Sequence, residues 1–198
     1  MKRTHKREEL IRIGRDIIVR QGFNATGLSN ILTTAGVPKG SFYYYFDSKE
    51  DFGLAIIEDS AHSYQKKLER TIGNSQLSPL KRLNSYFEAG IAEMEACGCV
   101  NGCLIGNLAQ EMAGQSEVFR DRLNKIFFSW EEQFANCLEA ARETQEISYK
   151  VTPTDLAQFV LAGWQGAILQ AKVARSTAPM QTFARTFFSQ ISPKSIVG

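Results

Sequence analysis

Apolar residues recur every three to four positions through almost the whole chain, and alternating stretches that would predict a strand are nearly absent. The first such segment ends at Gly22. Its apolar face consists of Leu10, Ile13, Gly14, Ile17 and Ile18. Stretches rich in Gly, Pro and Ser interrupt the pattern. The helices predicted between these breaks span about residues 27–35, 39–46, 49–72, 79–96, 103–113, 117–146, 153–175 and 180–191. The sequence therefore predicts an all-α fold.

The first three predicted helices form a small N-terminal part. Thr26 is placed to cap the second helix, and Ser48 is placed to cap the fourth. We expect a three-helix head over residues 1–50 and a larger helical body over residues 51–198, connected by the helix over residues 49–72.

Charge is distributed unevenly between these two parts. Residues 1–50 hold nine Lys and Arg against five Asp and Glu, a balance of +4, whereas residues 51–198 hold fourteen against sixteen, a balance of −2. A basic head on a mildly acidic body indicates an anionic partner for the head alone. The apolar fraction of 43% is enough to bury a substantial core and argues against disorder.

The N-terminus and the apolar segments bear on the compartment. The charged start MKRTHKREEL leads straight into an amphipathic pattern, so we do not expect a signal peptide. The most apolar segment, FVLAGWQGAILQA, is too short to span a bilayer. We therefore expect a cytoplasmic protein whose four cysteines are thiols and not a disulfide framework.

The stretch PKGSFYYYF, residues 38–46, has an unusual density of rings. At 100° per residue, the side chains predicted to face inward are Phe42, Tyr45 and Phe46. Those predicted to face outward, with Lys39 at the helix start, are Gly40, Ser41, Tyr43 and Tyr44. Gly40 leaves room for close approach, and hydroxyls and a cation around it are groups that contact phosphates and base edges.

The preceding helix has a similar outer surface. Its outward residues are the short polar Ser29, Asn30, Thr33 and Thr34. Two short helices around a Gly-containing turn, the second with a polar outer face, indicate a helix-turn-helix DNA-binding domain over residues 1–50. The arm MKRTHKR is either a further phosphate or minor-groove contact or a solvated tail.

A family resemblance covers about residues 5–55. The residues that carry it are Gly22-Phe23, Thr26, Ile31, Ala35-Gly36-Val37, Lys39-Gly40-Ser41-Phe42-Tyr43, Tyr45-Phe46 and Ser48-Lys49-Glu50. This order resembles the DNA-binding head of the TetR family of bacterial regulators. The resemblance implies an all-α homodimer whose third helix enters the major groove of operator DNA, and a body that binds a small inducer and then lowers the affinity for DNA.

The resemblance also implies DNA contacts by position. The residues expected at the DNA are Thr26, Lys39, Gly40, Ser41, Tyr43, Tyr44 and Lys49. Gly40 and Ser41 are expected nearest the bases, and the others at phosphates. Since the third helix lacks Arg, Asn and Gln, no strong bidentate base pairing is available, and specificity is expected to depend on DNA shape.

The body has two helices suited to pairing. The helix over residues 117–146 carries apolar residues at spacings of three and four, and the helix over residues 153–175 has small residues on one line, namely Gly163, Ala167, Ala171 and Ala174. These two helices are read as a four-helix dimer interface, with ordinary intrachain core as the alternative. Trp130 and Trp164 are candidates to line a ligand cavity, or are ordinary core.

The cysteines of the body are its most unusual feature. Cys97, Cys99 and Cys103 lie close together in the chain with no histidine nearby, so no metal site is expected. They are either buried small hydrophobes or include a reactive thiol. Cys103 is expected in the first turn of a helix, where the helix dipole favours thiolate. Lys172 interrupts an apolar helix and is either a cation that activates this thiol or a snorkelling side chain.

The body more loosely resembles the branch of TetR-like repressors that respond to reactive electrophiles such as N-ethylmaleimide, quinones and aldehydes. The segments GCLIGNLAQEMA and LQAKVARS carry this resemblance. The leading hypothesis is a one-component transcriptional repressor released by a thiol-reactive electrophile or oxidant trapped by Cys103. The alternative inducer is an apolar or aromatic ligand bound reversibly in the body, with the cysteines structural.

Two other classes of protein are disfavoured. The two histidines, with no nucleophile elbow, phosphate loop or metal cluster, argue against an enzyme, and no cofactor is expected. A general DNA-packaging protein would call for a more basic chain than the net +2 observed.

Overall fold

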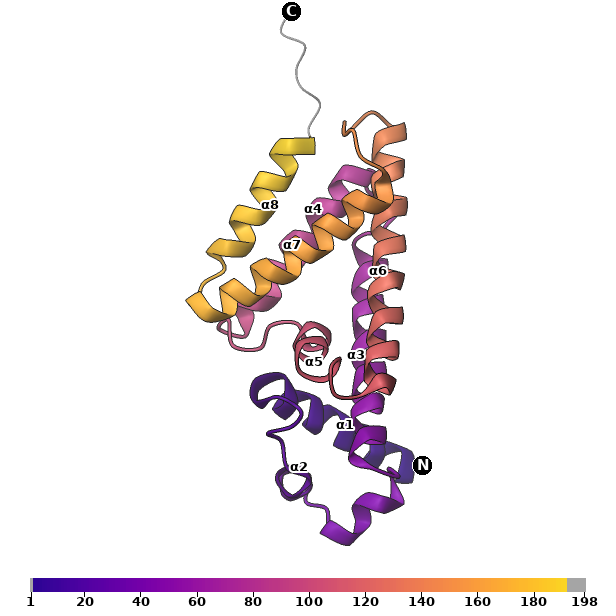
Figure 1. Cartoon of the computed structure of the whole chain (residues 1–198), viewed down its shortest axis with the longest axis vertical. Helices are drawn as coiled ribbons and strands as arrows, with labels where there is room; N and C mark the ends of the chain where they lie inside the picture. The colour runs from indigo at the N-terminus through magenta and orange to yellow at the C-terminus, as the bar shows by residue number, and fades with distance from the viewer. Residues whose placement is uncertain (1, 192–198) are drawn as a thin grey trace, which may run out of the picture. The chain divides into compact units, whose positions relative to one another are not determined.

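The computed structural model describes residues 2–191, with side chains from residue 5 onward. The predicted all-α fold is confirmed, since no strand occurs in residues 2–191 (Figure 1). The elements are α1 (Lys2–Gln21), α2 (Leu28–Thr34), the 3-10 helix η1 (Lys39–Tyr44), α3 (Lys49–Arg70), α4 (Pro79–Ala96), α5 (Leu104–Met112), α6 (Glu117–Glu143), α7 (Pro153–Ala174) and α8 (Ala178–Ile191). None of the helices in this range is long and apolar enough to cross a membrane.

The helix boundaries follow local capping chemistry. Ser48 caps α3 as predicted, because its Oγ accepts a hydrogen bond from the backbone N–H of Asp51 at 3.0 Å. Thr152 caps α7 in the same way, accepting from the Asp155 N–H at 3.1 Å. Pro79 and Pro153 stand in the first turns of α4 and α7, where a missing N–H leaves no intrahelical bond unmade.

The structure corrects the Thr26 cap and refines the description of the third helix and of the N-terminal arm. The third helix is a 3-10 helix, η1, because the segment between Pro38 and the following turn is short enough for the tighter winding. Thr26 is not the N-cap of α2, since Gly27 occupies that position and the buried Thr26 hydroxyl donates to the Gly22 carbonyl at 2.6 Å. The N-terminal arm is helical from Lys2 onward, which argues against the alternative of a solvated tail, and its contact with DNA stays a prediction. Met1 and the side chains of residues 2–4 lie outside the described part.

The chain divides into two compact units. The first unit consists of the chain up to Tyr64 together with Cys103–Asn124, and the second of Gln65–Gly102 together with the chain from Lys125 onward. The expected boundary after residue 50 cuts the sequence once, whereas α3 and α6 each run from one unit into the other. The short helix α5, expected in the body, belongs to the same unit as the helix-turn-helix.

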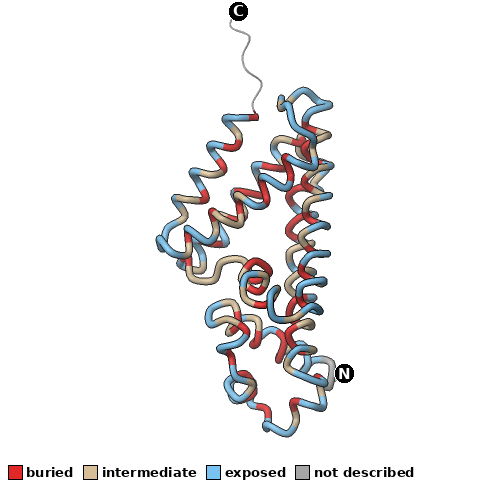
Figure 2. The backbone as a smooth tube through the Cα atoms, in the orientation of Figure 1, coloured by how far each residue is buried: buried red, intermediate tan, exposed pale blue. Residues whose placement is uncertain are grey.

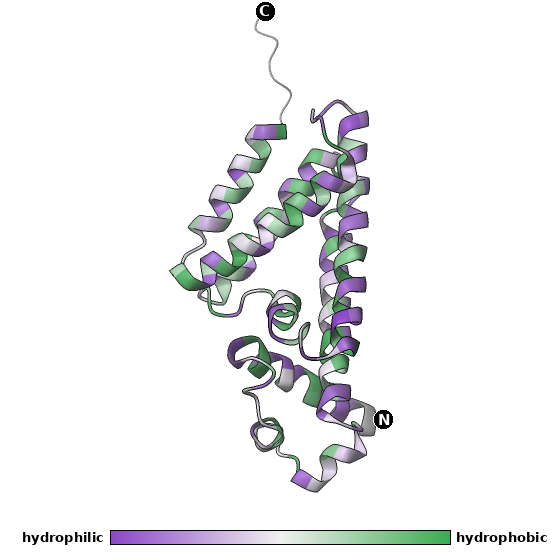
Figure 3. Ribbon diagram, viewed as in Figure 1, coloured by the Kyte–Doolittle hydropathy of each residue, from purple (hydrophilic) through white to green (hydrophobic). Residues whose placement is uncertain are grey.

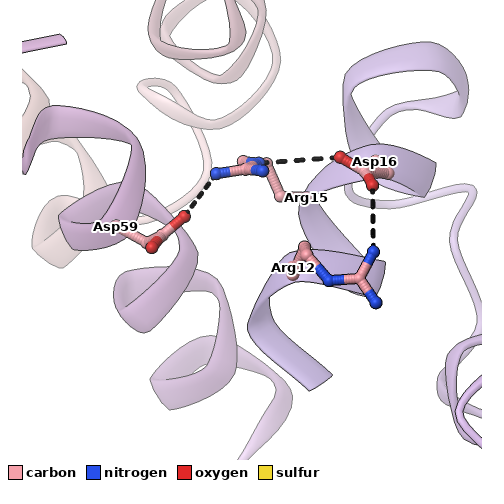
Figure 4. Close-up of polar contacts among 4 residues, drawn as sticks. All are labelled: Arg12, Arg15, Asp16 and Asp59. Atoms are coloured by element: carbon pink, nitrogen blue, oxygen red, sulfur yellow. Dashed lines mark hydrogen bonds and ion pairs between the residues drawn. The ribbon is translucent and has the colours of Figure 1, made fainter. Parts of the chain in front are cut away.

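The first unit has a small aromatic core, and polar side chains join its helices. Phe42, Phe46 and Phe52 are each at most 1% exposed, and the rings of Phe46 and Phe52 meet edge to face with centroids 4.8 Å apart. Arg15 on α1 reaches Asp59 on α3 at 2.7 Å (Figure 4). This ion pair joins α1 to the middle of α3.

The second unit has a larger aromatic core. Rings from α4, α6 and α7 meet in it: Tyr86 contacts Phe134 with centroids 4.7 Å apart, and Phe87 contacts Trp164 at 4.8 Å. Buried positions recur along each of these helices (Figure 2), and they coincide with the hydrophobic stripes (Figure 3). Burial of these rings is the main source of stability for this unit.

The small residues of α7 are used inside the chain. A Cβ added at Gly163 would lie 2.4 Å from a ring carbon of Phe183 on α8, and Ala167 and Ala171 are buried. Gly163 therefore lets α8 approach α7, as in the alternative of ordinary intrachain core. Ala174 is exposed, and the dimer interface stays a prediction. Other apolar side chains of α7 are exposed, among them Phe159 and Val173 at 66% and 79%.

Candidate DNA interface and inducer site

The outer surface of η1 has the composition that the sequence predicts. Tyr43 and Tyr44 are 68% and 57% exposed, and Lys39 and Gly40 are exposed beside them. The Phe42 side chain points inward, with its ring edge-on to that of Phe52 at 5.7 Å. The predicted faces are confirmed for the buried Phe42 and Phe46 and for the exposed Gly40, Tyr43 and Tyr44.

One η1 residue and the residue that follows the helix are only partly exposed. Ser41 and Tyr45 are half-buried, and the Tyr45 ring packs edge to face on that of Tyr44 with centroids 5.1 Å apart. This contact restricts the orientation of the exposed Tyr44 ring.

Gly40 is not required by packing within the chain. A Cβ added there would meet no atom within 4 Å, and its backbone is not in the left-handed region. On α2 the outward residues predicted to lie against a sugar–phosphate backbone, Ser29, Asn30, Thr33 and Thr34, are all exposed. The two elements together present a polar surface with one position free of a side chain.

Thr26 and Lys49, expected at phosphates, serve the loop between α1 and α2. Thr26 is fully buried on the Gly22 carbonyl. The Lys49 Nζ donates to the Phe23 carbonyl at 2.8 Å and lies 4.7 Å from the centre of the Phe23 ring. Burial lowers the pKa of the Lys49 ammonium, and the charge of Glu111 opposes that shift. A phosphate contact by either side chain stays a prediction.

Cys103 stands one position before the helix turn in which it was expected. It is the N-cap of α5, and its Sγ accepts from the backbone N–H of Gly106 at 3.5 Å. The side chain is half-buried, and all four cysteines are thiols. Among the residues described, no three His, Cys, Asp or Glu side chains are grouped as ligands of a metal ion would be.

The other three expected inducer residues lie in the second unit. Trp164 is 1% exposed within the aromatic core, and Trp130 is 2% exposed with its ring against Phe127. Lys172 is half-buried in the last turn of α7. Lys67, which no motif in the sequence marks, is buried against the Tyr86 ring and pairs with Glu93 at 2.7 Å.

Sequence comparison identifies the family. The family described as "Bacterial regulatory proteins, tetR family" matches residues 10–56, and that described as "Tetracyclin repressor-like, C-terminal domain" matches residues 79–187. The chain belongs to the TetR family. It is 34% identical over 195 residues to the HTH-type transcriptional repressor DhaR of Mycobacterium sp. strain GP1, covering 98% of this chain and 96% of DhaR. It is also 34% identical to the repressor NemR of Escherichia coli K12, covering 88% of each chain.

Solved structures of TetR-family proteins agree with this fold. A regulatory protein TetR from Rhodobacter sphaeroides superposes with a TM-score of 0.88 at 36% identity, covering 93% of this chain and 97% of that one. The reduced form of E. coli NemR gives a TM-score of 0.88 at 32% identity, covering 97% and 100%. As a TetR-family transcriptional repressor, the protein binds operator DNA as a homodimer and is released by a small inducer.

Proposed function

We propose that the TetR-family head binds operator DNA through η1 and the outer face of α2. The observation that supports this most is the pair of exposed phenols, Tyr43 and Tyr44, beside a glycine that nothing in the chain requires. Lys39 and Ser41 add a cation and a hydroxyl to the same surface. Gly40 and Ser41 approach the bases, while Lys39 and the two phenols bind phosphates. Thr26 and Lys49 would have to leave their carbonyl partners to join them.

Operator recognition then depends mainly on the shape of the DNA. The residues of η1 include no Arg, Asn or Gln, which are the side chains that form bidentate pairs with guanine or adenine. A sequence preference is expected from groove width and deformability near the tyrosines. Substitution of a phosphate contact should therefore weaken binding to all sequences alike.

We propose Cys103 as the inducer-sensing thiol. Cys103 is the N-cap of α5, and its half-buried Sγ accepts from the Gly106 N–H at the start of the helix. The thiolate would add to the double bond of an electrophile such as a maleimide. A carbon–sulfur bond forms, the π bond breaks, and the carbon next to the carbonyl takes up a proton from solvent. The adduct would displace the sulfur from Gly106 and so disturb the start of α5.

Lys172, Trp130 and Trp164 of the second unit are proposed as further residues that take part in the response to the inducer. The two indoles would supply apolar contacts to a ligand. An alternative inducer is an apolar or aromatic ligand that binds reversibly, with the cysteines structural. Such a ligand would have to displace part of the ring packing among Tyr86, Phe87 and Trp164.

The proposal also covers the dimer interface, the lack of catalytic activity and the cellular compartment. The exposed apolar side chains of α7, including Phe159, Leu169 and Val173, are proposed as part of the dimer face. The matched relatives are transcriptional regulators, and we propose a regulator without catalytic activity that acts in the cytoplasm, where operator DNA is accessible.

The proposal is tested by anisotropy with a labelled duplex that the wild-type protein selects from a random library. N-ethylmaleimide should raise the Kd of the wild-type protein for this duplex by about 5- to 150-fold, the usual range of allosteric coupling. Cys103→Ser should abolish this response. The matched control is Cys137→Ser, because burial raises the pKa of the Cys137 thiol to about 11 and makes it unreactive. A response that survives Cys103→Ser would favour the reversible ligand.

A further inference from the structure

The helix that begins at Cys103 is joined to the DNA-binding head by one carboxylate. Glu111, in the last turn of α5, accepts hydrogen bonds from two successive backbone amides of the α1–α2 loop. Its Oε2 lies 2.8 Å from the Phe23 nitrogen, and its Oε1 lies 2.7 Å from the Asn24 nitrogen. Both oxygens of the carboxylate are therefore used on the loop, across 88 and 87 residues of sequence.

Neighbouring contacts confine this carboxylate. The Gln115 Oε1 accepts from the Asn24 side chain at 3.0 Å, and the Gln115 side chain in turn donates to the Glu111 carbonyl at 2.7 Å. The Lys49 ammonium holds the opposite side of the loop through the Phe23 carbonyl. The loop is thus fixed from α5 through its N–H groups and from α3 through its carbonyls.

The backbone of the loop is shaped to admit the carboxylate. Gly22 has φ +87°, which favours glycine, and a Cβ there would lie 3.0 Å from the Glu111 Oε2. A second contact, from the Asn107 side chain to the Val19 carbonyl at 3.2 Å, joins α5 to the end of α1. Nothing larger than glycine at position 22 fits without moving the carboxylate.

The position of α2 depends on this loop. Helix α2 is only seven residues long and has no side-chain hydrogen bond at its N-cap. A helix this short has little stability of its own, so its direction is set by the segments that flank it. The amides of Phe23 and Asn24 lie in the segment immediately before it. A shift of Glu111 therefore moves the start of α2 and, through the following turn, η1.

We propose that Glu111 is a positioning residue for operator binding. It contacts no DNA itself, but it holds the α1–α2 loop so that α2 and η1 present their polar faces in the arrangement that binds the operator. Hydrogen bonds from N–H groups to a carboxylate are short and directional, so they transmit small displacements better than apolar packing does.

The same contact gives α5 a route to the head, a consequence that rests on the proposed role of Cys103. Cys103 and Glu111 stand at the two ends of α5, roughly 12 Å apart at 1.5 Å per residue. An adduct at the N-cap displaces α5 as a unit, and the carboxylate carries that displacement to the loop.

Glu111→Gln is the decisive variant. The glutamine amide is isosteric but has one acceptor oxygen, so one of the two loop amides loses its partner and faces an NH₂ group. We expect the Kd for the selected operator duplex to rise about tenfold, as for loss of a charge-assisted hydrogen bond. Glu111→Asp, which keeps the charge but shortens the reach, should lie between wild type and Glu111→Gln. The matched control is Glu117→Gln, whose side chain is 86% exposed in the first turn of α6, and it should bind as wild type does.

Amide hydrogen exchange separates positioning from general stability. In Glu111→Gln the amides of Phe23 and Asn24 should exchange faster, while those of α7 and α8 and the melting temperature stay close to wild type. A purely structural role would accelerate exchange throughout and lower the melting temperature. Faster exchange at these two amides with wild-type operator affinity would overturn the proposal, as would unchanged exchange. If Glu111→Gln does not fold, Glu111→Asp carries the same test.

The role of Cys103 is judged separately in the same samples. If N-ethylmaleimide does not change operator binding by the wild-type protein, the proposed electrophile response fails, and the affinity of Glu111→Gln before treatment still decides the role of Glu111. If the wild-type protein responds, the ratio of Kd after and before treatment should be smaller in Glu111→Gln. An equal ratio would remove α5 as the route.

Discussion

The two compact units of this TetR-family repressor are stabilised by different kinds of contact. In the first unit, elements distant in sequence are joined by directional polar contacts, such as Glu111 to the α1–α2 loop and Arg15 to Asp59. In the second unit, α4, α6, α7 and α8 meet mainly through rings, with Phe87 within 6.0 Å of the ring centres of both Trp164 and Phe183. The directional polar contacts fix the relative positions of the elements that they join, whereas the ring contacts bury apolar surface.

This difference suits the tasks of the two units. A DNA-binding surface must hold its groups at defined spacings, and hydrogen bonds lose strength quickly when distance or angle changes. Ring packing depends less on direction, and its contribution to stability grows with the apolar area that it buries. Substitutions of the buried rings of the second unit should therefore act on stability, and substitutions at the outer surface of η1 on operator affinity.

The largest expected effect is that of Trp164→Ala. Removing a side chain that is 1% exposed at the centre of the aromatic core should lower the free energy of unfolding by about 3–5 kcal/mol. Urea unfolding at one fixed protein concentration measures this, since the dimer makes stability depend on concentration. Val151→Ala, at a half-exposed loop position, is the control and should change little. A loss below about 1 kcal/mol for Trp164→Ala would mean that the aromatic core is not the main support of this unit.

A pair of glycine substitutions sharpens the comparison inside the first unit. A Cβ at Gly53 would lie 2.5 Å from Phe119 and 2.6 Å from Phe23, so Gly53→Ala should cost about 1–3 kcal/mol of stability. Gly40→Ala meets no atom within 4 Å and should leave stability unchanged while weakening operator binding, because the methyl group occupies the space proposed for DNA. Urea unfolding and anisotropy measure the two effects. Normal operator binding by Gly40→Ala would contradict close approach at that glycine.

The helix boundaries and the outer face of η1 follow from the sequence because their causes are local. Ser48 and Pro153 act within one turn of their own position. The inner position of Phe42 and the outer positions of Tyr43 and Tyr44 were predicted correctly although the helix type was not. An α-helix turns 100° per residue and a 3-10 helix 120°, so over six residues the two place the neighbours of Phe42 on similar sides. Over a longer segment the two periods would diverge.

The Glu111 contact has no comparable signal in the sequence. Its partners are backbone amides, which every residue except proline carries, so neither Phe23 nor Asn24 marks the site. Periodicity shows that one face of α5 is buried but not which element covers it, and α5 was therefore expected in the body. The Thr26 cap was predicted wrongly for a related reason. A threonine before a helix can accept from a backbone N–H of the helix or donate to a preceding carbonyl, and here its hydroxyl donates to the Gly22 carbonyl.

The smallest expected effect concerns an exposed ion pair of the first unit. Both nitrogens on one edge of the Arg122 guanidinium bind the Glu58 carboxylate, one of them at 2.6 Å, and these hydrogen bonds lower the pKa of Glu58. A lowered pKa stabilises the folded state at pH values above the usual carboxyl pKa, and this contribution is lost as the pH falls through the folded-state pKa. Because the Glu58 side chain is 54% exposed and the pair is screened by solvent, Glu58→Gln should cost less than about 1 kcal/mol at pH 7.

Urea unfolding of Glu58→Gln and wild type across pH, and at low and high salt, checks the ionic origin of this term. The difference between the two proteins should be largest near neutral pH, vanish in acid, and shrink in about 1 M salt, where the screening length is near 3 Å. Glu117→Gln, which removes a more exposed carboxylate, should show a smaller difference at every pH. If the Glu58→Gln difference persisted unchanged in acid and in high salt, the contact would act through packing of the Arg122 stem and not through charge. Directional polar contacts would then not stabilise the exposed surface of the first unit.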